Sequence, residues 1–309
     1  MDRIRRVSIV GMGALGILYG DFFAGTLGQE QVTFLADSDR VKNYKDHPVY
    51  CNDREWRFQV QDGAVPDSRG AAQLILFAVK ATALEAAARA VKNQVGKDTI
   101  ILSVLNGISS EEVIGHILGR EHMLYCVAQG MDAVKLGNRL TYSHMGEICI
   151  GIPESEAEKE PLLKKVTDLF DETGLPYTRE ADILRRLWCK WMLNVGVNQA
   201  VMVAEGTYGT VQKPGKERHM MMDAMEEVVA LAQKENIQVT GEDLQSYVDL
   251  VDTLNPEGMP SMRQDGLAHR RSEVEFFAGT VIRKAEKHGL DVPVNRELYQ
   301  RITEMEKAY

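Results

Sequence analysis

Short apolar runs alternate with helical stretches along the first half of the chain. Four of these runs are rich in aliphatic and β-branched residues, as buried strands are: RVSIV (6–10), QVTFLAD (31–37), LILFAVK (74–80) and TIILSVLNG (99–107). The intervening segments ILYGDFFAGTL and ALEAAARAVKNQV have a helical pattern instead. Strands that alternate with helices predict a mostly parallel sheet with helices on both faces. Two later runs, MLYCVAQGMDAV and EICIGIP, predict further strands.

The second half of the chain has a helical pattern throughout. Residues 181–204 predict a long helix, with a bend expected near Gly196, and residues 219–237 predict an amphipathic helix. Residues 264–289 predict one further long helix, which ends at Gly289.

The change of pattern after Pro176-Tyr177 predicts a domain boundary. A chain of 309 residues of which 44% are hydrophobic is long enough for two cores. We therefore expect an α/β protein with an N-terminal domain over residues 1–181 and an all-helical C-terminal domain over residues 182–309.

The first predicted strand leads directly into a glycine-rich turn. Its six residues, which match the pattern G-x-G-x-x-G, are Gly11, Met12, Gly13, Ala14, Leu15 and Gly16. Such glycines let the backbone turn tightly and approach a pyrophosphate, which the N-terminus of the following helix then faces. The strand before the turn, the helix after it and the acid at the end of the next strand together predict a Rossmann dinucleotide-binding domain. A glycine turn that serves only packing is the alternative.

The residues after the second predicted strand give conflicting signals about the cofactor. Asp37 lies 21 residues beyond Gly16, where an acid usually accepts hydrogen bonds from the adenosine ribose, as in NAD sites. Arg40 lies three residues further on and is suited to the 2′-phosphate of NADP. The choice between NAD and NADP therefore stays open.

Three polar residues stand out in the apolar stretch LWCKWMLNVGVNQAVM. Lys190, Asn194 and Asn198 are spaced four residues apart, so they share one face of a helix. An ammonium group in a dry core is costly unless it has a partner or a cavity. The stripe is therefore either a ligand site, or a lysine that reaches solvent beside asparagines that bridge helices.

Several further polar residues occupy positions with functional alternatives. Lys80 and Asn106 lie at the carboxyl ends of predicted strands, where ligands of such folds bind, although a solvated lysine is the simpler interpretation of Lys80. Ser109 and Glu112 predict a capping box for the helix EEVIGHIL. Glu273 falls within the long helix predicted over 264–289, where a carboxylate is usually solvated.

Composition narrows the classes of function. The net charge of −9 argues against a nucleic-acid or anionic-membrane surface. The four cysteines form no C-x-x-C pair and the seven histidines no H-x-x-x-H pair, so we expect free thiols and no metal site. No apolar run reaches the roughly 18 residues of a membrane span. We expect a soluble, cytoplasmic protein, either a monomer or a homodimer.

Taken as a set, these motifs resemble the ketopantoate reductase (2-dehydropantoate 2-reductase) family. The resemblance rests on the order GMGALG, VK at a strand end, LNG, LWCKWMLNVGVN, SMRQD and SEVE, which spans nearly the whole chain. It implies an enzyme that reduces 2-dehydropantoate to pantoate with NADPH, in the pathway to pantothenate and coenzyme A. The small-molecule partner would then be a 2-keto acid.

The resemblance also implies roles for individual residues. Residues 11–16 would hold the cofactor pyrophosphate, Lys80 would lie near its adenosine side, and Ala133 would border it through the backbone. Asn106 would sit where nicotinamide meets substrate, and Lys190 would be the general acid. The substrate-binding residues would be Asn194, Asn198 and Ser261, with Glu273 beside both cofactor and substrate.

Two positions depart from the family pattern. Asp37 stands where NADP-dependent members have an arginine, and Tyr208 stands where well-matched members have a substrate-contacting asparagine. A reductase of another branched 2-keto acid is therefore the second hypothesis. A non-catalytic dinucleotide sensor is the third, although it has no use for a proton donor in its site.

Overall fold

The computed structural model describes residues 3–309 and divides the chain into two compact units. The first unit contains residues up to Leu105 and the segment Ser109–Ile183. The second contains Asn106–Ile108 and Leu184–Tyr309. Met1 and Asp2, which the predicted first domain includes, lie outside the described residues.

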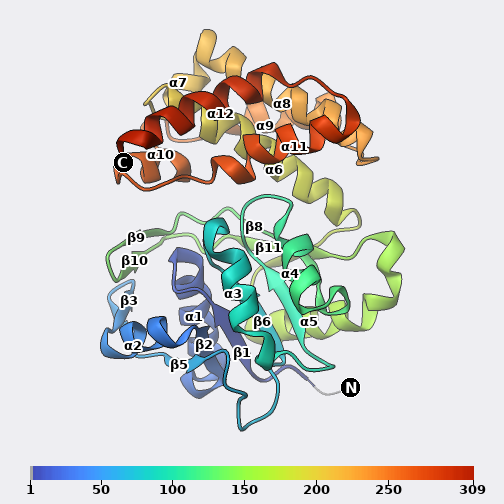
Figure 1. The fold of residues 1–309 in the computed structure, drawn as a ribbon. Helices are drawn as coiled ribbons and strands as arrows, with labels where there is room; N and C mark the ends of the chain where they lie inside the picture. The colour runs from blue at the N-terminus through green and yellow to red at the C-terminus, as the bar shows by residue number, and fades with distance from the viewer. Residues whose placement is uncertain (1–2) are drawn as a thin grey trace. The chain divides into compact units, whose positions relative to one another are not determined.

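A five-stranded parallel sheet forms the centre of the first unit (Figure 1). Its strand order is β5-β2-β1-β6-β7. The strands are β1 (Val7–Val10), β2 (Val32–Ala36), β5 (Gln59–Asp62), β6 (Leu74–Phe77) and β7 (Ile100–Ser103). Ile9 pairs with Phe34 on one side and Leu76 on the other, so the carboxyl ends of these central strands lie at one edge. The four strands expected from the apolar runs are confirmed, and the α/β fold class with them.

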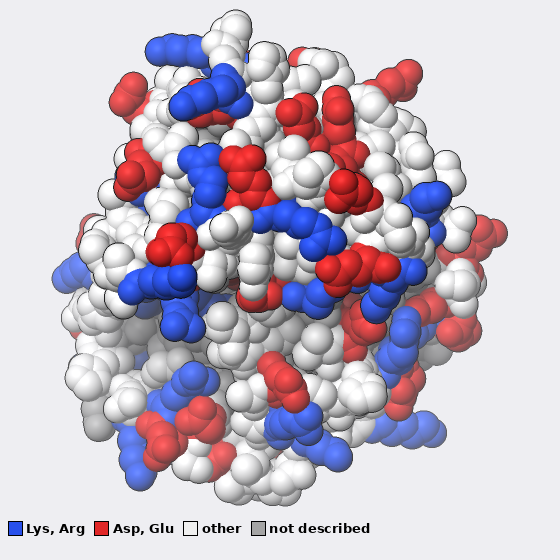
Figure 2. Space-filling model, turned by 45° about the horizontal axis from the view of Figure 1, so that its top comes forward, with Lys and Arg blue, Asp and Glu red and all other residues white. Residues whose placement is uncertain are grey.

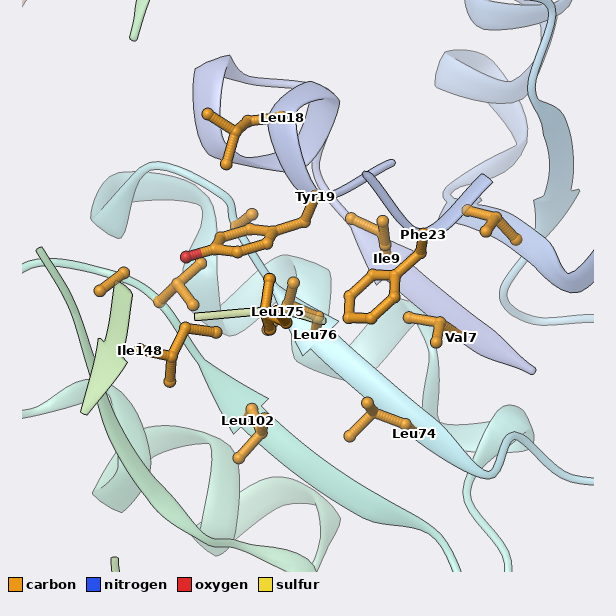
Figure 3. Close-up of a cluster of buried hydrophobic side chains, with 14 of the residues drawn as sticks. Val7, Ile9, Leu18, Tyr19, Phe23, Leu74, Leu76, Leu102, Ile148 and Leu175 are labelled. Carbon is orange, nitrogen blue, oxygen red and sulfur yellow. The ribbon is translucent and has the colours of Figure 1, made fainter. Parts of the chain in front are cut away.

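Five helices belong to the first unit: α1 (Ala14–Leu27), α2 (Ser38–Asp46), α3 (Leu84–Ala90), α4 (Ser110–Leu118) and α5 (Glu160–Thr173). Figure 3 shows Tyr19 and Phe23 of α1 directed into the same apolar cluster as Leu76 and Leu102 of the sheet. Both aromatic rings are 1% exposed. Burial of side chains this large contributes most of the free energy that holds α1 against the sheet.

Two smaller sheets complete the first unit. One has the order β12-β11-β8 and the other β4-β3-β10-β9. Their strands are β3 (Val49–Cys51), β4 (Arg54–Trp56), β8 (Tyr125–Gln129), β9 (Val134–Leu136), β10 (Arg139–Thr141), β11 (Glu147–Gly151) and β12 (Tyr177–Arg179). Asp21 of α1 accepts hydrogen bonds from the Trp56 indole at 2.6 Å and the Tyr142 hydroxyl at 3.3 Å, which attaches α1 to the second of these sheets.

The described part of the second unit is helical. Its helices are α6 (Ile183–Val203), α7 (Tyr208–Gln212), α8 (Lys216–Lys234), α9 (Gly241–Thr253), α10 (Ser261–Leu267), the 3₁₀ helix η6 (Val274–Phe276), α11 (Ala278–His288) and α12 (Pro293–Met305). Helix α6 continues through Gly196 without interruption. A Cβ atom at Gly196 would lie 2.5 Å from Met225 Cγ, so this glycine serves the close packing of α6 on α8.

The single helix expected over residues 264–289 is wrong. It is divided into α10, η6 and α11, and Glu273 lies in the connection as the residue before η6. The break follows from His269, whose φ of +49° ends the helical path, and from the Arg270 amide, which bonds back to the Asp265 carbonyl at 2.9 Å. Glu306 then accepts from the Ser272 amide at 2.8 Å and satisfies the interrupted backbone.

The capping box expected at the start of α4 is also wrong. Ser109 occupies the N-cap but makes no side-chain capping bond within the described chain. The neighbouring hydroxyl of Ser110 donates instead to the side chain of Glu111 at 2.9 Å. Both side chains are buried, so the polar residues that begin this helix face the protein interior.

Charged side chains of both signs are interspersed over the face shown in Figure 2. Among the ion pairs of the chain, Arg218 and Asp252 make two hydrogen bonds of 2.7 and 2.8 Å. Among residues 3–309, no helix is long and apolar enough to cross a membrane. In the same residues, no three His, Cys, Asp or Glu side chains gather in a group that would hold a metal ion.

Candidate active site

Two glycines of the motif, Gly11 in the turn after β1 and Gly16 in the first turn of α1, are required by the fold itself. Gly11 has a φ of +105°, and a Cβ atom there would lie 2.7 Å from the Ala78 carbonyl oxygen. A Cβ atom at Gly16 would lie 1.9 Å from the Gly11 carbonyl oxygen. Packing therefore excludes any side chain at both positions.

Gly13, in contrast, is not required by backbone or packing. Its φ of −79° suits any residue, and a Cβ atom there would meet only the Ala78 carbonyl, at an ordinary 3.5 Å. Gly13 is the N-cap of α1, which has no side-chain capping bond and no acid in its first turn among the described residues. The N-terminal amides of α1 thus suit an anion that comes close to the backbone, as a pyrophosphate does.

The other residues of the glycine motif pack against the first unit. Met12, Ala14 and Leu15 are half-buried and pack against the core of the first unit. These contacts help to position the backbone of the turn.

Asp37 and Arg40 both belong to the start of α2, and they contact each other. The Asp37 carboxylate caps α2 by accepting the Arg40 amide at 2.9 Å and pairs with the Arg40 guanidinium at 3.3 Å. Both side chains remain about half exposed, at 47% and 48%. Asp37, an acid of the type found in NAD sites, and Arg40, which is suited to NADP, are therefore neighbours that form one ion pair.

Lys80 and Ala133 lie at the ends of strands of the first unit. Lys80 is exposed, follows β6 and precedes a 3₁₀ turn, whose Ala83 amide bonds to the Lys80 carbonyl at 2.9 Å. Ala133 is half-buried and immediately precedes β9.

Helix α6 carries the polar stripe of the second unit. Asn198 is 6% exposed, and its side-chain oxygen accepts from the Met262 amide at 3.2 Å and the Ser261 hydroxyl at 3.3 Å. Its side-chain nitrogen donates to the Asn194 oxygen at 3.2 Å. Asn198 therefore links α6 to the first turn of α10 and brings Asn194 and Ser261 into one hydrogen-bonded group.

Asn194 has an unused donor. Its side-chain nitrogen Nδ2 is buried and has no hydrogen-bond partner among residues 3–309. An unsatisfied buried donor costs about 1–3 kcal/mol, so such atoms are rare unless a ligand binds them. It lies one turn of α6 beyond Lys190, which is itself half-buried.

Contacts with the backbone of η6 connect the segments that contain Glu273 and Asn106 to α6. The Trp191 indole of α6 donates to the Phe276 carbonyl at 2.9 Å, and the Glu273 carbonyl in turn accepts the Phe276 amide at 2.9 Å. A Cβ atom at Gly107 would lie 3.8 Å from the same Phe276 carbonyl oxygen. The segment that contains Asn106 thus meets η6 close to Trp191, the residue after Lys190.

Sequence reasoning missed the residues that anchor this arrangement. Gln199 is fully buried, and its side chain donates to the Val195 carbonyl at 2.8 Å and accepts the Ala278 amide at 3.2 Å. With the Trp191 indole it fixes η6 and α11 against α6. An amide side chain within the apolar run NQAVM was the available signal, since a buried glutamine needs partners.

The chain belongs to the ketopantoate reductase family. Residues 7–155 match the family described as "Ketopantoate reductase PanE/ApbA", and residues 182–306 match "Ketopantoate reductase PanE/ApbA C terminal". The chain is thus an oxidoreductase of this family, and its first unit has a dinucleotide-binding fold. The 2-dehydropantoate 2-reductase of Streptococcus pyogenes serotype M3 is 25% identical over 293 residues, which cover 94% of each chain.

Solved structures share the fold over almost the whole length. A ternary structure of D-mandelate dehydrogenase with NADH and anilino(oxo)acetate has a TM-score of 0.85 at 22% identity, covering 98% of each chain. A dimeric ketopantoate reductase from Staphylococcus aureus has a TM-score of 0.80 at 20% identity, covering 98% of this chain and 99% of that chain.

If Gly13 leaves room for a dinucleotide, its replacement should affect binding and not folding. We expect Gly13→Ala to weaken NADPH or NADH binding about tenfold or more, while the free energy of unfolding changes by less than about 1 kcal/mol. Gly25→Ala is the matched control, because it lies further along α1, where an added Cβ meets its nearest atom only at 3.6 Å. Fluorescence titration and thermal unfolding measure the two effects. Equal cofactor affinity of both variants would exclude the role of Gly13.

The two asparagines of α6 should differ in their effect on stability. Asn198→Ala leaves the buried Met262 amide without its acceptor, which should cost about 1–3 kcal/mol in chemical denaturation. Asn194→Ala should cost about 1 kcal/mol, less than Asn198→Ala, because it removes only the one bond that Asn198 Nδ2 donates, together with an amide nitrogen that has no partner in the described chain. A larger loss for Asn194→Ala would mean that this residue is a structural bridge and not a ligand donor.

Proposed function

We propose that this protein reduces 2-dehydropantoate to pantoate with a nicotinamide dinucleotide, the step that supplies pantoate for pantothenate and coenzyme A. The observation that carries the proposal is the unused amide donor of Asn194, one helical turn from Lys190 and bonded to Asn198. Family membership over both halves of the chain supports the reaction, as does a relative of that name that matches 94% of this chain.

The first domain, residues 1–181, would bind the cofactor. The backbone of Gly11, Gly13 and Gly16 and the N-terminus of α1 would hold the pyrophosphate, and their geometry fits it because Gly13 leaves open space. Asp37 would contact the adenosine ribose and Lys80 the adenosine side, with the Ala133 backbone alongside. When bound, the reduced nicotinamide supplies hydride to the carbonyl carbon of the substrate.

The choice between NADPH and NADH depends on the ion pair of Asp37 and Arg40. A 2′-phosphate would repel the Asp37 carboxylate and attract the Arg40 guanidinium, so NADPH binding requires the pair to open. A free ribose hydroxyl would instead donate a hydrogen bond to the Asp37 carboxylate while the ion pair stays intact. NADP is the cofactor implied by the resemblance, and NAD is the one that the intact pair favours.

The second domain, residues 182–309, would bind the substrate and supply the proton. As hydride reaches the carbonyl carbon, negative charge develops on the carbonyl oxygen, and the Lys190 ammonium stabilises and then protonates it. Loss of this proton leaves Lys190 as a neutral amine, which then takes up another proton from solvent. Asn194 Nδ2 donates to the substrate without adding a competing charge.

Three further residues would complete the substrate site. Ser261 and Asn198 are already linked by a hydrogen bond, so the Ser261 hydroxyl is oriented before the substrate carboxylate arrives. Glu273 would lie beside Lys190 and hold it charged, and Asn106 would contact the nicotinamide and substrate together.

A reductase of another 2-keto acid is the second candidate. Tyr208 occupies the position of a substrate-contacting asparagine, and its ring lies 3.0 Å from a Cβ atom placed at Gly258, in the loop that leads to Ser261. The fold match to D-mandelate dehydrogenase adds an aromatic 2-keto acid to the alternatives. A homodimer is the assembly that the Staphylococcus aureus protein suggests, with a monomer as the alternative.

A substrate panel tests the proposed function. Ketopantoate, ketoisovalerate, ketoisocaproate and phenylglyoxylate would each be supplied with NADPH and with NADH, and the loss of reduced-nicotinamide absorbance followed. We expect the highest kcat/KM with ketopantoate, by about tenfold or more, since differential contacts to its hydroxyl are worth a few kcal/mol.

Two other outcomes contradict the proposal. A higher kcat/KM with phenylglyoxylate or a simple branched keto acid would establish the second candidate. Cofactor binding without turnover of any keto acid would indicate a dinucleotide sensor.

A further inference from the structure

A chain of buried hydrogen bonds closes the loop between β7 and α4. The Ser110 hydroxyl donates to Glu111 Oε2 at 2.9 Å, and the Ser103 hydroxyl donates to Ser110 Oγ at 2.8 Å. Ser103 Oγ in turn accepts the Leu105 amide at 3.4 Å. Ser103, Ser110 and Glu111 are 0%, 3% and 5% exposed, so water does not replace these bonds.

The direction of this chain is fixed by its end at Glu111. A serine hydroxyl has one proton, and the Ser110 hydroxyl donates it to Glu111 Oε2. Because Ser110 gives its proton to Glu111, its oxygen must accept from Ser103, whose oxygen is then available to the Leu105 amide. Without an acceptor at residue 111, both hydroxyls lose the arrangement that holds the loop.

The carboxyl group of Glu111 is expensive to bury. Burial raises its pKa to about 7, although the Ser110 hydroxyl and the Glu111 amide act in the opposite direction. Tyr125 of β8 interacts with it electrostatically. An apolar side chain would fill this position at lower cost, so the fold alone does not explain an acid here.

The hydrogen-bonded chain joins the two ends of a short loop, residues 104–109. Ser103 is the last residue of β7, and Ser110 is the first residue of α4. The Val104 amide is also held, by the Phe77 carbonyl at 3.0 Å. The middle of the loop, Asn106–Ile108, is grouped with the second unit, whereas both of its ends belong to the first.

We propose that Glu111 is a positioning residue, which acts through Ser110 and Ser103 to fix the loop that carries Asn106. The proposal rests on the proposed function for the role of Asn106 in the reaction, but not for the order of the loop. Glu111 touches neither substrate nor cofactor in this account. Its contribution is the fixed geometry of a loop whose displacement by about 1 Å would slow turnover strongly.

The adjacent acid provides a matched control. Glu112 lies in the same first turn of α4 but is exposed to solvent. Glu111→Ala and Glu112→Ala therefore remove the same carboxyl group from neighbouring positions, of which the first is buried and the second is exposed. Glu111→Gln keeps an acceptor oxygen for Ser110, and Ser110→Ala breaks the chain one step further on.

Hydrogen–deuterium exchange of the full chain tests the order of the loop without using activity. We expect Glu111→Ala and Ser110→Ala to speed exchange in the peptide over residues 104–109 about tenfold, with the α1 and α8 peptides unchanged. Glu111→Gln and Glu112→Ala should exchange as the wild type does. Equal exchange in all variants, or a uniform rise over the whole chain in Glu111→Ala and Ser110→Ala, would overturn the proposal.

Steady-state kinetics test the consequence for the reaction. Glu111→Ala should lower kcat about tenfold while the dissociation constant of the cofactor changes less than twofold, because the pyrophosphate site lies on another loop. Glu111→Gln should restore kcat to within about threefold of the wild type. A kcat of Glu111→Ala equal to that of Glu112→Ala would overturn the positioning role. If the wild type turns over no keto acid, the proposed function fails, and the exchange experiment still decides the role of Glu111.

Discussion

The helical unit depends on the two hydrogen bonds that the buried side-chain oxygen of Asn198 accepts. This oxygen accepts the Met262 amide and the Ser261 hydroxyl, and so fixes where α10 begins relative to α6. The Trp191 and Gln199 side chains fix η6 and α11 on the same helix. Asn194, Asn198 and Ser261 are therefore positioned by one helix, and Asn194 retains a donor that these contacts do not use.

A similar distinction between structural and functional residues holds in the first unit. Gly11 and Gly16 are explained by contacts within the chain, because a Cβ atom at either position would overlap backbone. Gly13 is not explained in this way, and its small size has a use only if something else approaches the backbone. In each unit, function is indicated by a feature that the described contacts do not use: the small size of Gly13 and the amide nitrogen of Asn194.

The elements with long regular apolar patterns could be predicted from sequence. The strands β1, β2, β6 and β7 are buried throughout, so their composition identifies them. The edge strand β5, QVQD, is exposed to half-buried. Because it has no repeated apolar positions, its sequence does not predict a strand.

Features that depend on tertiary contacts could not be predicted. The break after α10 depends on Glu306, 34 residues away, which satisfies the Ser272 amide. The Ser109–Glu112 spacing fits a capping box, but the fold instead turns Ser110 and Glu111 inward toward Ser103. The spacing of Lys190, Asn194 and Asn198 predicted a shared helix face. The difference between the bonded Asn198 and the unused donor of Asn194 depends on contacts with α10, which lies far along the chain.

The central claim is that Lys190 donates the proton, and the turnover of Lys190→Ala tests it most directly. The account predicts that kcat with the preferred keto acid falls about 10²-fold or more, with thermal stability retained and partial rescue by added methylamine. Lys234→Ala, which removes an exposed lysine of α8, should turn over as the wild type does. A kcat of Lys190→Ala within a few-fold of the wild type would contradict the claim.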